Sequence, residues 1–152
     1  MVKSQLNSDE IRELIPHREP FLFLDQLTNI KELETATGVK TFTSSDHFFK
    51  GHFPGQPVVP GVILIEMMAQ TAAALIAYSI RKETFNKIVY LMNIDNTKFR
   101  KPVFPNNKVF SNVNALRSRG RVWKFTGKTI DSKKQIICEA TWSAMIMDRD
   151  NE

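Results

Sequence analysis

The stretch GHFPGQPVVPGVILIEMMAQTAAALIAYSI, residues 51–80, decides the fold of this chain. Its first part predicts a loop, because Pro54, Pro57 and Pro60 each fix φ and lack an amide hydrogen. The apolar run that follows predicts a helix over 61–79, roughly 30 Å long at about 1.5 Å of rise per residue. Because this helix is apolar on every side, we expect the rest of the chain to surround it.

A membrane-spanning segment is the alternative for an apolar run of this length. Glu66 and Gln70 argue against it, since a carboxylate near the middle of a span costs about 2.5 kcal/mol or more. The run is also rich in alanine, which lets a sheet approach a helix closely, although small residues suit membrane helix pairs as well. We therefore predict a buried core helix and no contact with a membrane.

Length and composition are those of an ordinary globular domain. The 152 residues predict one domain, 1–152; 42% of them are hydrophobic and 24% are charged. Residues 1–10 contain no apolar segment of the secretory type. The only cysteine, Cys138, has no partner for an internal disulfide. We expect a cytoplasmic protein.

Positive charge is concentrated in one segment. Between Lys98 and Lys134 the chain has eleven Lys or Arg and one acid, Asp131, so this segment carries +10 within a total of +5. The rest of the chain is therefore net negative. Such a concentration predicts an acidic partner, and the alternative is a solvated strand face.

Patterns on either side of the long helix predict a second, short helix and six strands. A capping box formed by Asn7 and Glu10 starts the short helix, and Pro16 stops it near Leu14. The predicted strands are 21–30 and 34–43 before the long helix, and 88–99, 109–117, 121–130 and 136–146 after it. Residues 118–120 are expected to form the turn of a hairpin.

The last of these strands has the clearest alternation. Its apolar residues recur at every second position and predict one buried face made of Ile136, Cys138, Ala140, Trp142, Ala144 and Ile146. The strand 88–99 is less regular, and Asn93, Asp95 and Asn96 leave an interruption open. The order of elements predicts an α+β fold in which an antiparallel sheet wraps around the long central helix. The pattern alone leaves a ferredoxin-like arrangement open.

Candidate catalytic residues gather where the loop meets the helix. His52 follows a glycine in the proline-rich loop, and a histidine held by a rigid loop can act as a general base near neutral pH. The other two histidines are His17 and His47, and any one histidine taken alone is more often structural. We expect no metal site, because no third histidine or second cysteine joins His47 and His52.

Glu66 favours a catalytic over a structural function for this region, because an ionised carboxylate is costly to bury in an apolar helix. Desolvation raises the pKa of such a group and favours a protonated acid, and a neutral base beside a protonated acid is a recurring device in proton chemistry. The helix starts at Gly61, and the free backbone amides there can donate hydrogen bonds to a polarised carbonyl oxygen. These features predict proton chemistry on an acyl group. The alternative is that Glu66 is hydrogen-bonded core polarity, paired with Gln70.

Four separate motifs resemble those of one enzyme family. They are PHREPFLFLD at 16–25, GHFPGQPVVPGVILIEMMAQ at 51–70, IDNTKFRKPVFP at 94–105 and GRVWKFTG at 120–127. In this order and spacing they closely resemble the 3-hydroxyacyl-acyl-carrier-protein dehydratases of bacterial type II fatty acid synthesis, the FabZ type. The resemblance extends over residues 14–146, nearly the whole chain.

The resemblance implies a hot-dog fold, with the long helix inside a wrapped sheet, and dimers that usually assemble as a trimer of dimers. His52 matches the family's catalytic histidine and Glu66 its catalytic acid, the two residues of one site coming from different subunits. Glu66 also favours a plain dehydratase, because the similar dehydratase-isomerases carry aspartate there. The amide of Gly61, with that of Val62 beside it, matches the donor that polarises the thioester. Tyr90 lies near the family's tunnel mouth and is expected to gate it.

The implied reaction removes water from a 3-hydroxyacyl group on acyl carrier protein and gives the trans-2-enoyl product. It needs no metal and no other cofactor. Carrier proteins are strongly acidic, which gives the basic segment a function. The residues expected to receive the carrier are Arg100, Lys101, Arg117, Arg119, Arg121 and Lys124. We expect no nucleic-acid partner.

Two departures from the family pattern and two alternative functions stand beside this prediction. The Gly-Asp pair usual after the downstream proline is Asn106-Asn107 here, and Met67 replaces a small residue beside the acid. A hot-dog thioesterase would hydrolyse the thioester instead of eliminating water, and it usually places its acid elsewhere. A non-catalytic module that binds acyl groups, carrier protein or nucleic acid would rest on the basic segment alone.

Overall fold

The computed structural model describes residues 3–81 and 87–149. Its helices are α1 (Ser8–Leu14) and α2 (Gly61–Ser79), with a 3-10 turn, η1 (His47–Lys50), in the loop before α2. Its strands are β1 (Gln5–Asn7), β2 (Gln26–Lys31), β3 (Thr35–Thr41), β4 (Lys87–Phe99), β5 (Lys108–Arg119), β6 (Val122–Asp131) and β7 (Ile136–Asp148). Strand β1 is absent from the prediction, because three residues are too few to show an alternation.

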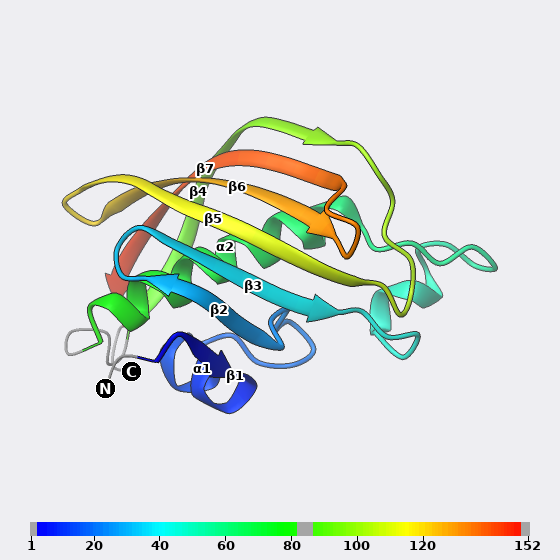
Figure 1. Cartoon of the computed structure of the whole chain (residues 1–152), viewed down its shortest axis with the longest axis horizontal. Helices are drawn as coiled ribbons and strands as arrows, with labels where there is room; N and C mark the ends of the chain where they lie inside the picture. The colour runs from blue at the N-terminus through cyan, green and yellow to red at the C-terminus, as the bar shows by residue number, and fades with distance from the viewer. Residues whose placement is uncertain (1–2, 82–86, 150–152) are drawn as a thin grey trace.

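Within the described residues the strands form one antiparallel sheet in the order β1-β2-β3-β5-β6-β7-β4. Figure 1 shows this sheet curling over α2, with α1 beside the β1–β2 edge. An antiparallel sheet wrapped around one long helix is the hot-dog fold, as expected. The ferredoxin-like alternative is excluded, because it would need two helices on one face of an open sheet.

Helix α2 is the core of the molecule. It is long and apolar enough to cross a membrane by length and composition, but 72% of its apolar window is buried inside the structure. Nearly all of its positions from Leu64 to Tyr78 are buried. It contacts α1 and every strand except β1. The prediction of a surrounded helix is therefore confirmed. The first turn is the exception, since Val62 is 72% exposed.

The first predicted strand begins too early. The capping box of Asn7 and Glu10 is present as predicted, but residues 21–25 form a loop and β2 starts only at Gln26. The apolar residues of this loop, Leu22, Phe23 and Leu24, are nevertheless buried. β-prone residues fit any half-buried surface, and here they anchor a loop onto α2 instead of entering the sheet.

The hairpin turn lies further along the chain than predicted. Arg119 pairs with Val122, so the turn consists of Gly120 and Arg121. Ser118 and Arg119 therefore belong to β5. Gly120 has a φ of +60°, which the tight two-residue hairpin turn requires and which glycine adopts without strain.

The buried face of β7 differs from the prediction at its start. Ile136 is 37% exposed, whereas Ile137 is buried. The register between β6 and β7 shifts here, since Thr129 pairs with Cys138 while Ile130 pairs with Ile136. Ile137 is thus the extra residue of a β-bulge, which turns its side chain inward. The alternation predicted at Cys138, Ala140, Trp142 and Ala144 is confirmed.

Strand β4 runs unbroken through its polar residues. The register against β7 shifts between Leu91 and Asn93 and again between Asp95 and Lys98, and Asn96 has a φ of +48°. The polar residues therefore bend the strand without ending it. Strand β4 forms one edge of the sheet, and its exposed apolar residues are Tyr90, Leu91, Met92, Ile94 and Phe99.

The two departures from the family pattern fit the fold. Asn106 has a φ of +69°, in the left-handed region that glycine favours and asparagine tolerates. The side chain of Asn107 supports the same turn by accepting a hydrogen bond of 3.0 Å from the amide of Phe104. Met67 is fully buried and fills part of the core between α2 and the sheet.

Candidate active site

Glu66 lies on the partly exposed face of α2, one turn before Gln70. Its Oε1 accepts a hydrogen bond of 3.0 Å from Gln70 Nε2. Gln70 is oriented by the loop before β2, because its Oε1 accepts from the amide of Phe23 at 2.8 Å and its Nε2 donates to the carbonyl of Phe21 at 2.9 Å. These backbone contacts assign the amide orientation, so Gln70 acts toward Glu66 only as a donor.

Burial raises the pKa of Glu66 above its ordinary value, and the hydrogen bond from Gln70 lowers it in part. The side chain of Glu66 is only 21% exposed. A raised pKa keeps a larger fraction of the carboxyl group protonated near neutral pH, and this is the form that a general acid needs. The alternative prediction, a pair with Gln70, is also seen, and the same contact serves both interpretations.

His17 is the residue that the sequence did not connect with the acid. Its Nε2 lies 3.6 Å from Glu66 Oε1, and its side chain is 20% exposed. Burial lowers the pKa of His17, and the positive charge of Arg18 lowers it further. We therefore expect a neutral imidazole near neutral pH. No signal in one sequence joins His17 to Glu66, because the two meet only when the loop before β2 packs against α2.

A small cavity of about 30 Å³ lies in front of the acid. It is lined by His17, Glu66, Ala69, Ala73, Val89, Leu91 and Ala144. A second cavity shares Ala73 and Val89 with it and continues along α2 past Ala77 to Ile80. Apart from Lys87 in the second cavity, the walls beyond His17 and Glu66 are apolar, so this line of cavities suits an apolar chain that begins at the acid.

His52 is held by the backbone of its own loop. Its Nδ1 lies 2.8 Å from the carbonyl of Val58, and the amide of Val58 donates to the carbonyl of His52 at 3.0 Å. The amide of His52 donates to the carbonyl of Phe48 at 3.1 Å, and the imidazole stacks on Phe53 with ring centroids 4.1 Å apart. Because a carbonyl only accepts, the neutral imidazole carries its proton on Nδ1 and has its lone pair on Nε2, the tautomer that a general base requires.

The structure does not bring His52 and Glu66 together within one chain. No hydrogen bond or ion pair joins these two residues, both of which lie in the described part of the chain, and His52 does not line the cavity at Glu66. In its place the acid meets His17. Among the described residues, no group of three or more His, Cys, Asp and Glu side chains could hold a metal ion.

The start of α2 offers free backbone amides beside the histidine loop. The cap position is Pro60, and no side chain caps this terminus. A Cβ atom at Gly61 would lie 2.8 Å from a ring carbon of Phe99, so any other residue here would have to displace that ring. The amides of Gly61 and Val62 point from a helix N-terminus, where the helix dipole favours a developing negative charge.

Tyr90 does not line the cavity of its own chain. Its neighbours Val89 and Leu91 face the cavity at Glu66, and alternate residues of a strand point to opposite faces. Tyr90 is 54% exposed and lies at the sheet edge. A gating function for Tyr90 remains a prediction, and it would have to act on a site completed by another chain.

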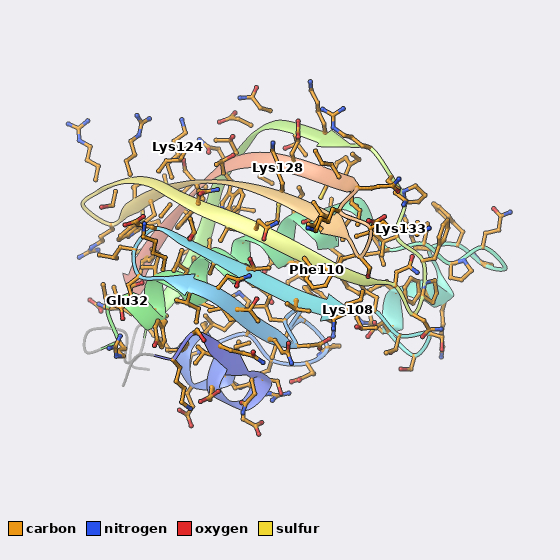
Figure 2. The ribbon with its side chains drawn as sticks, viewed as in Figure 1. Glu32, Lys108, Phe110, Lys124, Lys128 and Lys133 are labelled. Atoms are coloured by element: carbon orange, nitrogen blue, oxygen red, sulfur yellow. The ribbon has the colours of Figure 1, made fainter. Side chains whose placement is uncertain are left out.

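The basic residues fall into two groups. Arg100 forms an ion pair with Glu139 at 3.0 Å, and Lys101 binds Asp131 and Gln135. The second group, Arg117, Arg119, Arg121 and Lys124, surrounds the β5–β6 hairpin, and within the described chain none of its members forms an ion pair. Figure 2 shows Lys124 toward the hairpin and Lys108 and Lys133 toward the opposite end of the sheet.

Comparison with known proteins identifies the family. The family model of the FabA-like domain matches residues 15–141. The chain belongs to this family. It is 44% identical over 144 residues to the 3-hydroxyacyl-[acyl-carrier-protein] dehydratase FabZ of Paramagnetospirillum magneticum, covering 94% of this chain and 88% of that protein. The FabZ of Gluconacetobacter diazotrophicus is 47% identical over 138 residues, covering 90% of this chain and 84% of that protein.

Solved structures agree with the fold. The dehydratase heterocomplex ApeI:P from Xenorhabdus doucetiae matches with a TM-score of 0.77 at 17% identity, over 93% of this chain and 91% of that chain. A hypothetical thioesterase from Streptococcus pneumoniae, solved with coenzyme A, matches with a TM-score of 0.60 at 6% identity, over 82% of this chain and 87% of that chain. At these identities both likenesses concern the fold alone.

Proposed function

We infer that this chain is an enzyme that dehydrates 3-hydroxyacyl groups carried on acyl carrier protein, in fatty acid synthesis. Relatives named FabZ dehydratase are 43–47% identical to this chain over at least 90% of its length, which supports the reaction class. The observation that carries the inference is the environment of Glu66, a desolvated acid with a raised pKa beside an apolar cavity. A group of this kind can donate a proton to a leaving hydroxyl.

The residues divide the elimination among them. His52 Nε2 removes a proton from the carbon next to the thioester, while the amide of Gly61, with that of Val62 beside it, stabilises the charge that develops on the thioester oxygen. Glu66 gives its proton to the 3-hydroxyl group, the C–O bond breaks, and water leaves. A double bond forms between the second and third carbons. His52 then holds an extra proton and Glu66 lacks one, so proton exchange through solvent restores both.

A second copy of the chain completes the site in this proposal. His52 and Glu66 of one chain make no contact with each other, so the base that serves Glu66 comes from another copy. The sheet edge at β4 is long and carries exposed apolar residues, a surface that a second chain can cover. We extend the proposal to a dimer as the active unit and to a trimer of dimers as the larger assembly.

The β5–β6 hairpin is the proposed docking surface for the acidic carrier protein. Arg117, Arg119, Arg121 and Lys124 have no ion pairs to give up within the described chain. Arg100 and Lys101 are already paired with carboxylates, and we assign them a smaller part. The proposed location is cytoplasmic, in keeping with a single buried cysteine, Cys138, that forms no disulfide.

The proposed function is tested by hydration of a crotonyl thioester, carried on carrier protein or on coenzyme A. The reaction is measured through the absorbance of the conjugated enoyl group. We expect hydration by the wild type and a loss of about 10²- to 10⁴-fold in His52→Ala and in Glu66→Gln, with both variants still folded by circular dichroism. Activity that survives in either variant would overturn the assigned roles.

Two further readouts separate the alternatives. Release of free thiol from the same substrates would identify a thioesterase. Binding of acyl-carrier protein by a folded wild type that neither hydrates nor hydrolyses would identify a non-catalytic module. The thioesterase likeness at 6% identity concerns the fold only and adds no weight to the first alternative.

A further inference from the structure

His17 has an environment that packing alone does not explain. Its Nδ1 is buried and has no hydrogen-bond partner within the described part of the chain. Its Nε2 lies 3.6 Å from Glu66 Oε1, across the small cavity that the two residues help to line. A purely structural histidine usually has both ring nitrogens satisfied or one in water, because an unpaired buried polar atom is costly.

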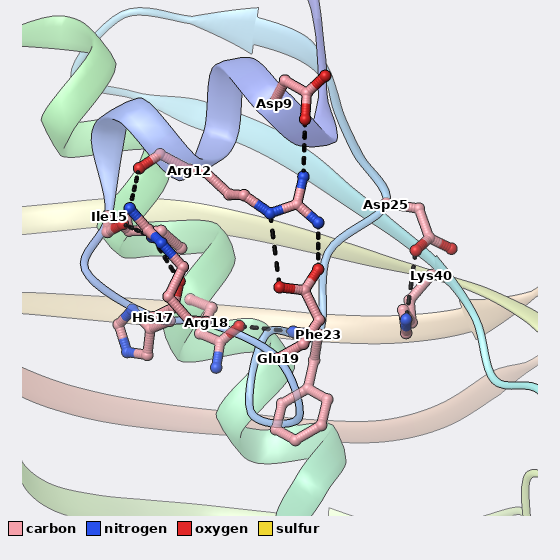
Figure 3. Close-up of polar contacts among 10 residues, drawn as sticks. Asp9, Arg12, Ile15, His17, Arg18, Glu19, Phe23, Asp25 and Lys40 are labelled. Carbon is pink, nitrogen blue, oxygen red and sulfur yellow. Dashed lines mark hydrogen bonds and ion pairs between the residues drawn. The ribbon is translucent and has the colours of Figure 1, made fainter. Parts of the chain in front are cut away.

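The backbone around His17 is fixed by its neighbour. The guanidinium group of Arg18 donates to the carbonyls of Arg12, Ile15 and His17, at 2.9, 2.9 and 2.7 Å. Figure 3 shows this fan of contacts, with His17 beside Arg18 and with Arg12 bridging Asp9 and Glu19. The backbone position from which the imidazole extends is therefore held by the loop itself.

The positive charge of Arg18 also affects the protonation of the His17 imidazole. Burial and this positive charge both disfavour the imidazolium form of His17. A neutral imidazole has one N–H, which lies on Nδ1 or on Nε2. A proton on Nδ1 would be a buried donor without an acceptor, which is rarer in proteins than an acceptor without a donor. The proton therefore belongs on Nε2, where it points toward Glu66.

Among the described residues, Glu66 is the only Asp, Glu, Lys or Arg that lines this cavity. Apart from His17 and Glu66, the cavity is lined by Ala69 and Ala73 of α2, Val89 and Leu91 of β4, and Ala144 of β7. Gln70 approaches from α2 and donates to Oε1 at 3.0 Å. His17 and Gln70 are thus two neutral donors aimed at the same oxygen of the carboxyl group.

We propose that His17 is a positioning residue for Glu66: its neutral imidazole donates from Nε2 to Glu66 Oε1 and leaves Oε2 as the oxygen that carries the catalytic proton. This inference rests on the proposed dehydratase function. When Oε2 gives its proton to the leaving hydroxyl, negative charge develops on the carboxylate. The present distance is longer than a hydrogen bond, and we expect it to shorten as that charge develops.

The test compares two substitutions that differ in the donor. His17→Leu keeps an apolar volume and removes the N–H, whereas His17→Gln keeps a neutral N–H that does not titrate. We expect His17→Leu to lower kcat about tenfold to a hundredfold with little change in KM, the size of a hydrogen bond to a charged group. His17→Gln should recover kcat to within a few-fold of the wild type. His47→Gln, at an exposed histidine, is the matched control and should not change kcat.

A readout independent of turnover follows the acid itself. Carboxyl-labelled glutamate observed by nuclear magnetic resonance reports the titration of Glu66 in each variant. Loss of a donor to the carboxylate should move this titration to higher pH in His17→Leu and leave it near the wild-type position in His17→Gln. An unchanged titration in His17→Leu, or a kcat equally low in both variants, would overturn the proposal.

The outcomes distinguish this inference from the proposed function. A wild type without hydratase activity would overturn the function, whatever His17 does. An active wild type with an unaffected His17→Leu variant would overturn the inference alone. Because Nδ1 has no partner to lose, His17→Leu should fold at least as stably as the wild type at neutral pH, and a thermal melt checks this.

Discussion

Glu66 and His52, the two groups of the candidate site, are held by different parts of the molecule. Glu66 lies on a helix and takes its contacts from Gln70 and His17, which in turn depend on the loop before β2. His52 lies in a loop and takes its contacts from residues close to it in sequence, namely the carbonyls of Phe48 and Val58 and the ring of Phe53.

This difference teaches where each group can be disturbed. The base depends on a short proline-rich loop in which the carbonyl of Val58 and the ring of Phe53 hold the imidazole, so only changes close to it in sequence should disturb it. The acid depends on side chains that reach it from across the fold, so a substitution far away in the sequence can weaken it. The asymmetry predicts that changes around the acid reach further along the chain than changes around the base.

The largest effect should come from separating the two groups between chains. His52→Ala and Glu66→Gln should each lose about 10²- to 10⁴-fold in activity. Mixed and exchanged in equal amounts, they should recover about a quarter of wild-type activity, because half of the dimers are mixed and each of these has one intact site of two. Hydration of crotonyl-carrier protein measures the recovery.

A matched control uses two variants with the same defect. A mixture of His52→Ala with His52→Gln exchanges subunits equally well but cannot assemble an intact site. Recovery in this control as well, or no recovery in the first mixture after mass spectrometry has verified exchange, would contradict a site shared between chains.

The second effect compares a support of the acid with a support of the base. Gln70→Leu leaves the amide of Phe23 and the carbonyl of Phe21 without their partner, so we expect a loss of about 2–4 kcal/mol in the free energy of unfolding. The activity should fall by about tenfold or more as well, because Glu66 loses a donor.

Val58→Ala is the corresponding change beside the base. It keeps the carbonyl that binds His52 and removes only part of a half-buried side chain. We expect kcat within about threefold of the wild type, a loss below 1 kcal/mol of barrier. Denaturant unfolding and steady-state kinetics measure both variants. Equal damage in Val58→Ala and Gln70→Leu would refute the asymmetry.

A third effect should leave both groups intact. Charge reversal at the hairpin, Arg119→Glu with Arg121→Glu, should raise KM for carrier-linked substrate roughly tenfold or more at low salt, because steering by opposite charges accelerates association by that order. kcat on a small thioester should stay unchanged, since neither Arg119 nor Arg121 lines the cavity at Glu66. The same change in KM for both substrates would argue against docking.

The smallest effect is in the pH dependence of stability. Burial raises the pKa of Glu66 from its ordinary value of 4.5, so the folded state holds this proton more tightly than the unfolded state. Its contribution to stability is complete below pH 4.5 and is lost as the pH rises through the folded-state pKa. The Tm of Glu66→Gln should therefore increase relative to the Tm of the wild type as the pH rises through that window, by a few degrees at most.

His17 should show the opposite slope. Its pKa is lowered from 6.5, so its contribution is present above pH 6.5 and is lost as the pH falls through the folded-state pKa. The Tm of His17→Leu should increase relative to the Tm of the wild type as the pH falls. Thermal melts across the pH range measure both variants, and curves parallel to that of the wild type would show that neither group is desolvated as described.

Much of the fold follows from local pattern. Pro60 and Gly61 mark the start of α2, and Asn7 with Glu10 marks the start of α1, because capping and proline geometry involve near neighbours. The strand at residues 21–25 and the buried position of Ile136 are wrong, because contacts with Gln70 and a β-bulge decide them. Such contacts depend on a partner that the local pattern does not contain.

The central helix, the wrapped antiparallel sheet and the candidate pair His52 and Glu66 could all be predicted from the sequence, since periodicity, prolines and family motifs are carried by neighbouring residues. The contacts of Glu66 with His17 and Gln70, and the separation of His52 from Glu66 within one chain, are seen only in the folded protein. The physical reason is that a helix and a loop each fix their own geometry, whereas the meeting of side chains from distant segments depends on how the whole core packs.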